Sequence, residues 1–167
     1  MRQFYDTFST PVGDFSVATD ATGAIIATAF GDLSALKKRF VVEEIVRDVA
    51  RIHRIRTEIA EYFSGSSQCF SAKLSPSGTP FQQNVWAALL RVPFGETCSY
   101  GELAAKSGSP DAARAIGRAN ATNPICLFIP CHRVIGRDGS LTGYAFGEKK
   151  KRWLINHEKA LIPLFVG

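Results

Sequence analysis

The first third of the chain alternates short apolar runs with turn residues, a pattern typical of strands joined by tight turns. The apolar runs span residues 4–8, 14–19 and 24–30. Turn residues at 11–13 and 20–23 separate these runs. The pattern predicts a small antiparallel sheet, and Asp32 is expected to cap a short helix that ends near Phe40.

A longer helix is predicted between residues 48 and 63, where apolar residues recur every three or four positions. Its apolar face consists of Ile52, Ile55, Ile59 and Tyr62. Ser64 and Gly65 end the helix, and residues 64–78 are rich in Ser and Gly, as a connection between domains is. We therefore expect an α/β domain over residues 1–77 and a second domain over residues 78–167.

The second domain begins with signals for helices. Thr79 can act as an N-cap, with Pro80 at the first helical position and Gln82 at the third, which completes a capping box. An apolar stripe follows through residue 89, and residues 93–95 end it. The first helix of this domain is therefore expected near residues 80–89.

Two short helices separated by a glycine turn come next. Ser99 and Glu102 predict a capped helix through Lys106, after which Ser107-Gly108 breaks the chain. The following helix is expected to open at Ser109-Pro110 and to run to about residue 120. This order is that of a helix-turn-helix, although helical hairpins also occur in proteins that never bind DNA. The second domain is thus predicted to be mainly helical and winged-helix-like.

The later of these helices is rich in alanine and carries two arginines on one face. Arg114 and Arg118 are four residues apart, and the small side chains around them include Ala115. A slim helix can approach another surface closely, and its arginines can reach phosphates or bases. An alanine-rich helix with solvated arginines remains the alternative.

Residues 129–135 form an apolar run that contains a thiol beside an imidazole and a guanidinium. The run favours a short buried strand with Pro130 at its irregular end, because proline donates no backbone hydrogen bond. Cys131 alone would suggest a small core residue. His132 and Arg133 argue against that reading, because buried cations need partners.

A neutral thiol is a poor nucleophile, so Cys131 requires a group that takes its proton. His132 is the nearest candidate, but adjacent residues of a strand point to opposite faces, so a direct contact is awkward. Glu158 is the best candidate for a third group that orients the imidazole. The basic run at 149–152 is interpreted as a solvated helix face.

Composition narrows the class of protein. No apolar segment approaches the ~18 residues of a membrane span, and the first residues lack the features of a signal peptide. The cysteines, with no CxxC pair or zinc-type spacing, are Cys69, Cys98, Cys126 and Cys131. We therefore expect a cytoplasmic protein with reduced thiols and no membrane partner.

The net charge of +5 is uneven along the chain. Residues 1–81 hold nine Lys/Arg and nine Asp/Glu, whereas residues 82–167 hold eleven and six, so the second half carries the whole surplus. This asymmetry is consistent with a polyanionic partner for that half or with a solvated basic face.

The segment Pro130-Cys131-His132-Arg133-Val134 resembles the active-site signature of the O6-alkylguanine-DNA alkyltransferases, also called methylated-DNA–protein-cysteine methyltransferases. Further segments follow the family's order and spacing: Gly78-Thr79-Pro80-Phe81-Gln82, Val85-Trp86, Pro93-Phe94-Gly95-Glu96-Thr97, Ser99-Tyr100-Gly101, Ala112-Ala113-Arg114-Ala115 and Asn123-Pro124. The resemblance covers about residues 78–160. Residues 1–77 resemble the family's variable N-terminal domain only in length and strand pattern.

The resemblance implies a DNA repair protein that moves an alkyl group from guanine O6 in duplex DNA to its own Cys131. His132, acting through a water molecule, and Glu158 would draw off the thiol proton. Tyr100 matches the tyrosine that supports guanine as a leaving group. Because the product is a thioether, we expect one turnover per molecule, no cofactor and no metal.

The resemblance also assigns residues that bind the lesion. The damaged base is flipped out of the duplex, Arg114 fills its place, and the helix lies in the minor groove with Arg118, Ala115 and Tyr100 near the DNA. Residues expected at the base pocket are Asn123, which braces the cysteine segment, Val134, Tyr144 and Ala145. Some relatives have serine at the position of Ala145, so only a backbone contact is expected there.

Three other functions remain open on sequence alone. A damage-recognition protein would flip alkylated bases without reacting, and a helix-turn-helix regulator would bind intact duplex selectively. A turnover cysteine hydrolase would form more than one equivalent of product. The expected protein is a monomer associated with the nucleoid through DNA, and the sequence leaves O4-alkylthymine open as a second substrate.

Overall fold

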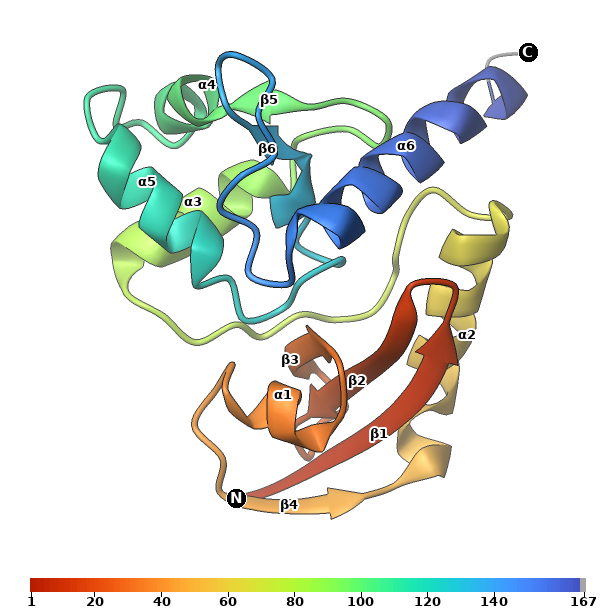
Figure 1. The fold of residues 1–167 in the computed structure, drawn as a ribbon. Helices are drawn as coiled ribbons and strands as arrows, with labels where there is room; N and C mark the ends of the chain where they lie inside the picture. The colour runs from red at the N-terminus through yellow and green to blue at the C-terminus, as the bar shows by residue number, and fades with distance from the viewer. Residues whose placement is uncertain (166–167) are drawn as a thin grey trace. The chain divides into compact units, whose positions relative to one another are not determined.

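The computed structural model describes residues 1–165 and divides into two compact units, Met1–Ser77 and Gly78–Gly167 (Figure 1). The first combines a sheet with helices, and the second is mainly helical. The predicted fold class, an α/β part followed by a helical part with a helix-turn-helix, is confirmed.

A four-stranded sheet forms the first unit, in the order β3-β2-β1-β4. Its strands are β1 (Arg2–Thr10), β2 (Gly13–Thr19), β3 (Ile25–Phe30) and β4 (Glu44–Arg47). The first three pair antiparallel, as predicted, but β4 pairs parallel to β1, so the sheet is mixed. The sequence did not predict β4 because this four-residue edge strand buries no side chain and so has no alternating pattern.

The core of the first unit is aromatic on one face of the sheet. Phe15 is fully buried, with its ring centroid 6.1 Å from that of Phe8 and 4.9 Å from that of Phe30. Two helices complete the unit, α1 (Leu33–Lys37) and α2 (Val49–Ser64). α2 lies against β1 and buries the apolar face that the sequence predicted (Figure 1).

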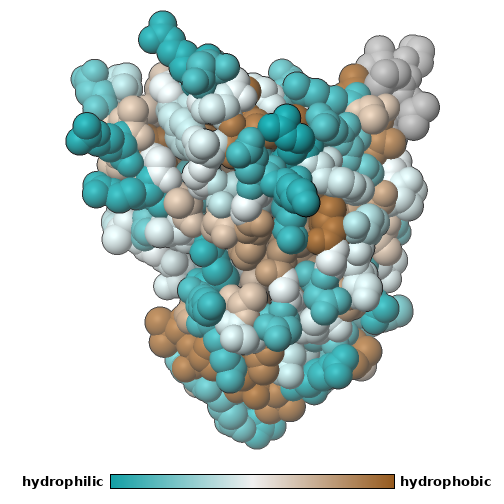
Figure 2. Space-filling view, in the orientation of Figure 1, coloured by the Kyte–Doolittle hydropathy of each residue, from teal (hydrophilic) through white to brown (hydrophobic). Residues whose placement is uncertain are grey.

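α2 is capped at both ends, and it ends at the glycine that the sequence indicated. The Asp48 side chain accepts a hydrogen bond from the N–H of Arg51, and Gly65 ends the helix with a φ of 83°. A left-handed C-cap favours glycine because a Cβ is strained there. Figure 2 shows apolar surface over the region of β1 and β4; apolar side chains exposed in this unit include Met1, Val41, Val46 and Val49.

Helices dominate the second unit. They are α3 (Pro80–Leu89), α4 (Tyr100–Lys106), α5 (Ala113–Ala121), the 3₁₀ helix η1 (Cys131–Arg133) and α6 (Glu148–Phe165). α3, α4 and α5 pack against one another, and two short parallel strands, β5 (Cys98–Ser99) and β6 (Val134–Ile135), connect the region before α4 to the residues after η1. The Thr79–Gln82 capping box forms as predicted, with both reciprocal hydrogen bonds present.

Two local predictions in this unit were wrong. α5 begins at Ala113 rather than at Ser109-Pro110, because residues 109–112 close a separate turn through an Ala112 N–H to Ser109 carbonyl hydrogen bond. Residues around Cys131 form η1 rather than a strand. Pro130 donates no hydrogen bond and its carbonyl accepts from the N–H of Arg133, which tightens the chain into a 3₁₀ turn.

The longest helix, α6, starts with a strongly charged segment. It opens on Glu148 and continues through the basic run at 149–152. Across residues 1–165, no helix combines the length and the apolar character needed to cross a membrane.

Candidate active site

Cys131 lies at the start of η1 and is 5% exposed. The segment that leads to it is held by buried amides. Nδ2 of Asn123 donates to the carbonyl of Ile129 at 2.8 Å, and Oδ1 of Asn123 accepts from the N–H of Ile125 at 3.0 Å. Asn120 of α5 donates to the carbonyl of Cys131 itself at 3.3 Å. The cysteine backbone is therefore tied to α5 and to the segment behind it.

This segment also contains backbone strain. Leu127 has a φ of 74°, and within residues 1–165 it is the only residue other than glycine with a positive φ. Its side chain is buried, so packing holds the conformation in place. Such a position costs on the order of 1–3 kcal/mol and persists where the surrounding structure over-determines it. Backbone strain of this kind is common at active sites, so its position four residues before Cys131 agrees with a functional role of this segment.

Behind Cys131, three side chains form a buried charged network. Nε2 of His132 lies 2.6 Å from Oε2 of Glu158, and Nε of Arg133 donates to Oε1 of Glu158 at 2.8 Å. Arg133 also donates to the carbonyl of Val92 at 2.8 Å. The N–H of Gly95 adds a 3.2 Å hydrogen bond to Oε1 of Glu158.

Gly95 can approach Glu158 and α6 this closely only because it has no side chain. Its φ is +81°, and a Cβ built on it would lie 2.4 Å from Cγ1 of Ile162 on α6. Glycine is therefore required here both for backbone conformation and for the approach to α6. The Pro93-Phe94-Gly95 turn thus helps to hold Glu158 in position.

The network fixes the charge of each member. Burial alone would raise the pKa of Glu158, but the charges and hydrogen bonds of His132 and Arg133 hold that pKa well below its usual range. Burial lowers the pKa of His132, and the pull of Glu158 in the opposite direction does not cancel this effect. At neutral pH the network therefore contains a carboxylate, a guanidinium and a neutral imidazole.

The carboxylate also decides the tautomer of His132. Because Glu158 is ionised and can only accept, we assign the imidazole proton to Nε2. Nδ1 then carries a lone pair, and it makes no hydrogen bond to residues 1–165. His132 can therefore accept one proton at Nδ1, and Glu158 stabilises the imidazolium that results.

A groove of about 440 Å³ opens beside α5. It is lined by Tyr100, Arg114, Gly117, Arg118, Ala121 and Gly143. Arg114 and Arg118 are exposed and line the groove together, as expected for one helix face. In Figure 2, hydrophilic groups project from the region of α4 and α5.

Tyr100 connects this groove with Cys131. Its hydroxyl donates to the carbonyl of Thr142 at 3.2 Å. Burial raises the pKa of Tyr100, and the negative charge of a Cys131 thiolate raises it further. The hydroxyl therefore stays protonated at neutral pH and is close enough to Cys131 to sense its charge.

The other predicted site residues do not line the groove. Val134 is fully buried in β6 and pairs with Cys98, and Asn123 is buried behind the cysteine. Tyr144 is also buried, with its ring centroid 5.7 Å from that of Phe146, whereas Ala145 is exposed. Ala115 is half-buried on α5. The roles expected for these residues at a bound base stay predictions.

The sequence interpretation of the basic run was wrong at one position. Lys151 was expected on a solvated face, but it is 0% exposed. The reason is helical periodicity, because Lys151 lies on the same face as buried Leu154, Ile155 and Glu158. The spacing of three, four and seven residues from Lys151 to these positions could have predicted its burial. Asn120 was also missed as a support of Cys131.

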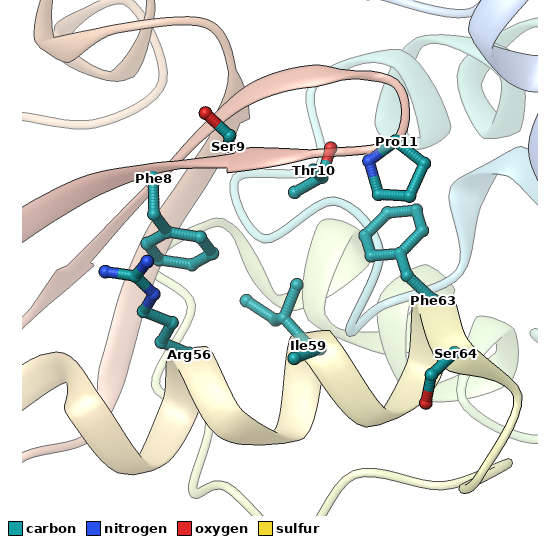
Figure 3. A pocket seen from close by; sticks show the side chains of 9 residues that line it. Phe8, Ser9, Thr10, Pro11, Arg56, Ile59, Phe63 and Ser64 are labelled. Carbon is teal, nitrogen blue, oxygen red and sulfur yellow. The ribbon is translucent and has the colours of Figure 1, made fainter.

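The first unit has a pocket of its own, of about 370 Å³, between the tip of the β1–β2 hairpin and α2 (Figure 3). Figure 3 shows Phe8, Ile59 and Phe63 facing it, with Arg56 over the ring of Phe8. It holds no cysteine, histidine or carboxylate. Among residues 1–165 no cluster of His, Cys, Asp and Glu could hold a metal ion. Another pocket of the first unit, of about 390 Å³, is lined by Asp14 and Asp32 but by no cysteine or histidine.

Comparisons with known proteins agree with this assignment. Residues 80–160 match the family described as 6-O-methylguanine DNA methyltransferase, DNA binding domain. A methylated-DNA–protein-cysteine methyltransferase of Methanosarcina acetivorans is 40% identical over 93% of this chain and 97% of its own. The constitutive methylated-DNA–protein-cysteine methyltransferase of Bacillus subtilis is 39% identical over 93% and 95%.

The fold comparison gives the same result. The structure of Mycobacterium tuberculosis OGT in complex with DNA superposes with a TM-score of 0.85 at 38% identity, over 95% of this chain and 94% of that one. Likeness of this extent covers both units of the chain, including the first, whose sequence resemblance was limited to length and strand pattern. The chain therefore belongs to the family of methylated-DNA–protein-cysteine methyltransferases.

Proposed function

We propose that this protein repairs alkylated DNA by direct reversal, moving an alkyl group from O6 of guanine to its own Cys131. One observation carries the proposal: Cys131 adjoins the buried network of His132, Arg133 and Glu158, and its ionised form raises the pKa of Tyr100, which lines the basic groove. Relatives that match nearly the full chain bear the name of this activity.

The reaction is a displacement at carbon. The Cys131 proton moves to Nδ1 of His132, relayed by water as the family resemblance implies, and Glu158 stabilises the imidazolium. The sulfur then attacks the alkyl carbon opposite O6, so that an S–C bond forms as the C–O6 bond breaks. O6 keeps the electron pair of the broken bond, and the guanine anion takes up one proton.

Tyr100 is proposed to assist the departing base. Its raised pKa keeps the hydroxyl protonated, so it can donate a hydrogen bond to the ring where negative charge develops. Removal of one donor of this kind typically costs a factor of about 10²–10³ in rate. The existing hydrogen bond to the carbonyl of Thr142 would have to be exchanged for the base.

The partner is DNA, and the proposed contact is made by α5 in the minor groove. Gly117, Ala115 and Ala121 keep this helix slim, and Arg114 is proposed to enter the base stack as the lesion swings out. Extrusion costs a few kcal/mol and is least where damage has weakened pairing. Arg118 would contact phosphates, which give affinity without sequence preference.

The proposed reaction ends with a thioether on Cys131. Cleavage of that S–C bond would require a second activated nucleophile, and the network beside Cys131 supplies only a base already used in the first step. We therefore expect one alkyl group transferred per protein molecule and a monomer bound to each lesion.

The test is intact mass spectrometry after incubation with a duplex that contains O6-methylguanine. We expect a single gain of about 14 Da, located on Cys131 and absent in Cys131→Ser. Cys126→Ser is the matched control, because Cys126 is a buried cysteine five residues away, and it should gain the same mass. No gain with tight binding would instead indicate a recognition protein, and product beyond one equivalent would indicate a hydrolase.

A further inference from the structure

A fully buried lysine shares a helix face with Glu158. Lys151 is 0% exposed and Glu158 is 1% exposed, and Leu154 and Ile155 between them are also buried. At 1.5 Å per residue the two charged residues are separated by about 10 Å along α6. This face packs against η1, the element that begins with Cys131.

The ammonium group of Lys151 has no ordinary partner. Nζ makes no hydrogen bond to any residue of the described chain. Buried charges are normally paired, because desolvation of an isolated ammonium is costly. Burial lowers the pKa of Lys151, and the negative charges that oppose this effect are those of Cys131, when ionised, and Glu148. Glu148 is exposed at the first residue of α6, so Cys131 is the buried one of the two.

The other groups around Cys131 do not supply this charge. Glu158 and Arg133 cancel each other within one ion pair, His132 is neutral, and Tyr100 is a neutral hydroxyl. A Cys131 thiolate formed by loss of its proton to solvent, before any proton reaches His132, would therefore face a network without net charge. Lys151 adds the missing positive charge.

We propose that the buried ammonium group of Lys151 is the counter-charge of the Cys131 thiolate. This inference deepens the proposed function and rests on it for the identity of the nucleophile. The ammonium stabilises the ionised sulfur, so a larger fraction of Cys131 is thiolate at neutral pH. Alkylation converts the thiolate into a neutral thioether and leaves Lys151 without its counter-charge. Lys151 thus acts through its charge on Cys131 as a positioning residue, and it makes no contact with the base.

The first test measures how readily Cys131 ionises, without DNA. Iodoacetamide forms an S–C bond with the thiolate and releases iodide, so its rate against pH reports the thiol pKa. The rate is followed on the Cys131 peptide by mass spectrometry, which separates it from the other cysteines. The variants are Lys151→Met, the charge-keeping Lys151→Arg, and the exposed neighbour Lys149→Met as the matched control.

For Lys151→Met we expect the Cys131 pKa to rise by about one unit or more, which slows the reaction at pH 7 about tenfold. Lys151→Arg should recover most of the rate, and Lys149→Met should follow the wild-type profile. A wild-type profile in folded Lys151→Met would overturn the inference. An equal shift in Lys149→Met would also overturn it, because the effect would then be one of net charge.

A second measurement covers the case in which Lys151→Met does not fold. Charge coupling is reciprocal, so removal of the thiolate must lower the pKa of Lys151 by the same amount. That pKa is read by NMR from the ε-carbon of labelled lysine in wild type and in Cys131→Ser. We expect a lower value in Cys131→Ser, and equal values would contradict the inference.

The outcomes separate this inference from the proposed function. A shifted iodoacetamide profile without methyl uptake from DNA would refute the function and leave the Lys151–Cys131 coupling intact. Methyl uptake with an unshifted profile would refute only the coupling.

Discussion

At the scale of single residues, charge states decide what the site can do. Glu158 stays ionised because His132 and Arg133 both donate to it, so it orients and stabilises rather than taking the proton. His132 stays neutral because it is buried, so it can accept a proton. The lowered pKa values of Glu158 and His132 also make the stability of the second unit depend on pH.

The sign of this dependence follows from the direction of each shift. The pKa of His132 is below its ordinary value of 6.5 and that of Glu158 is below its ordinary value of 4.5. In both cases the unfolded chain binds protons more readily than the folded chain. Stability is therefore full above about pH 6.5 and falls in two stages, first below about 6.5 and again below about 4.5.

We predict that Glu158→Gln removes the second stage and lowers the free energy of unfolding at pH 7 by about 3–5 kcal/mol, because it leaves Arg133 buried without its partner. Urea unfolding followed by tryptophan fluorescence measures this, since Trp86 and Trp153 both lie in the second unit. Exposed Glu96→Gln should unfold like the wild type. Parallel pH curves for Glu158→Gln and wild type would contradict the charge assignment.

Residue types and plausible reach suggested Cys131, His132 and Glu158 as a group, and the structure pairs Glu158 with His132, the neighbour of Cys131 in the chain. The sequence could not indicate that Arg133 binds the same carboxylate, because that pairing depends on how α6 packs against η1. Lys151 was misread because it lies in a basic run. Its spacing of three residues from Leu154 and seven from Glu158 indicated instead that it lies on the buried face of the helix.

At the scale of elements, capping residues were the most reliable guides. Asp32, Thr79 and Ser99 each accept a hydrogen bond from the third residue of the helix that the sequence assigned to them. Elements without a strong local signal were missed or displaced. α5 has no side-chain cap, and its start was misplaced by about four residues. β4 has no alternating pattern, and η1 arises from Pro130 and tertiary packing.

The surface of α5 leads to a prediction about Arg114. If Arg114 displaces the lesion base, Arg114→Ala should slow repair of duplex DNA by at least tenfold and leave the reaction with free O6-benzylguanine nearly unchanged, because the free base needs no extrusion. Rates of Cys131 alkylation with each substrate measure this.

Arg54→Ala is the matched control for that experiment. Arg54 is also an exposed helical arginine, but it lies on α2 in the first unit. It should react with both substrates at the wild-type rate. Equal losses on both substrates in Arg114→Ala would show that Arg114 acts on the chemistry or on folding instead.

At the scale of the whole molecule, the two units differ in what they contribute. The charge surplus lies in residues 82–167, together with the groove, the thiol and its network. The first unit is charge-balanced over residues 1–81, and its pocket between the β1–β2 hairpin and α2 carries no titrating nucleophile or acid. We therefore propose that the second unit binds DNA and accepts the alkyl group, and that the first unit supports it.

The most direct measurement of direct reversal follows the methyl carbon itself. A duplex with O6-methylguanine carrying an isotope-labelled methyl group is incubated with a slight excess of protein, and both products are analysed by mass spectrometry. We expect the intact labelled methyl on Cys131, in a one-to-one ratio with unmodified guanine restored in an uncut strand. Labelled methanol in solution, a missing base, or label on any other residue would contradict it.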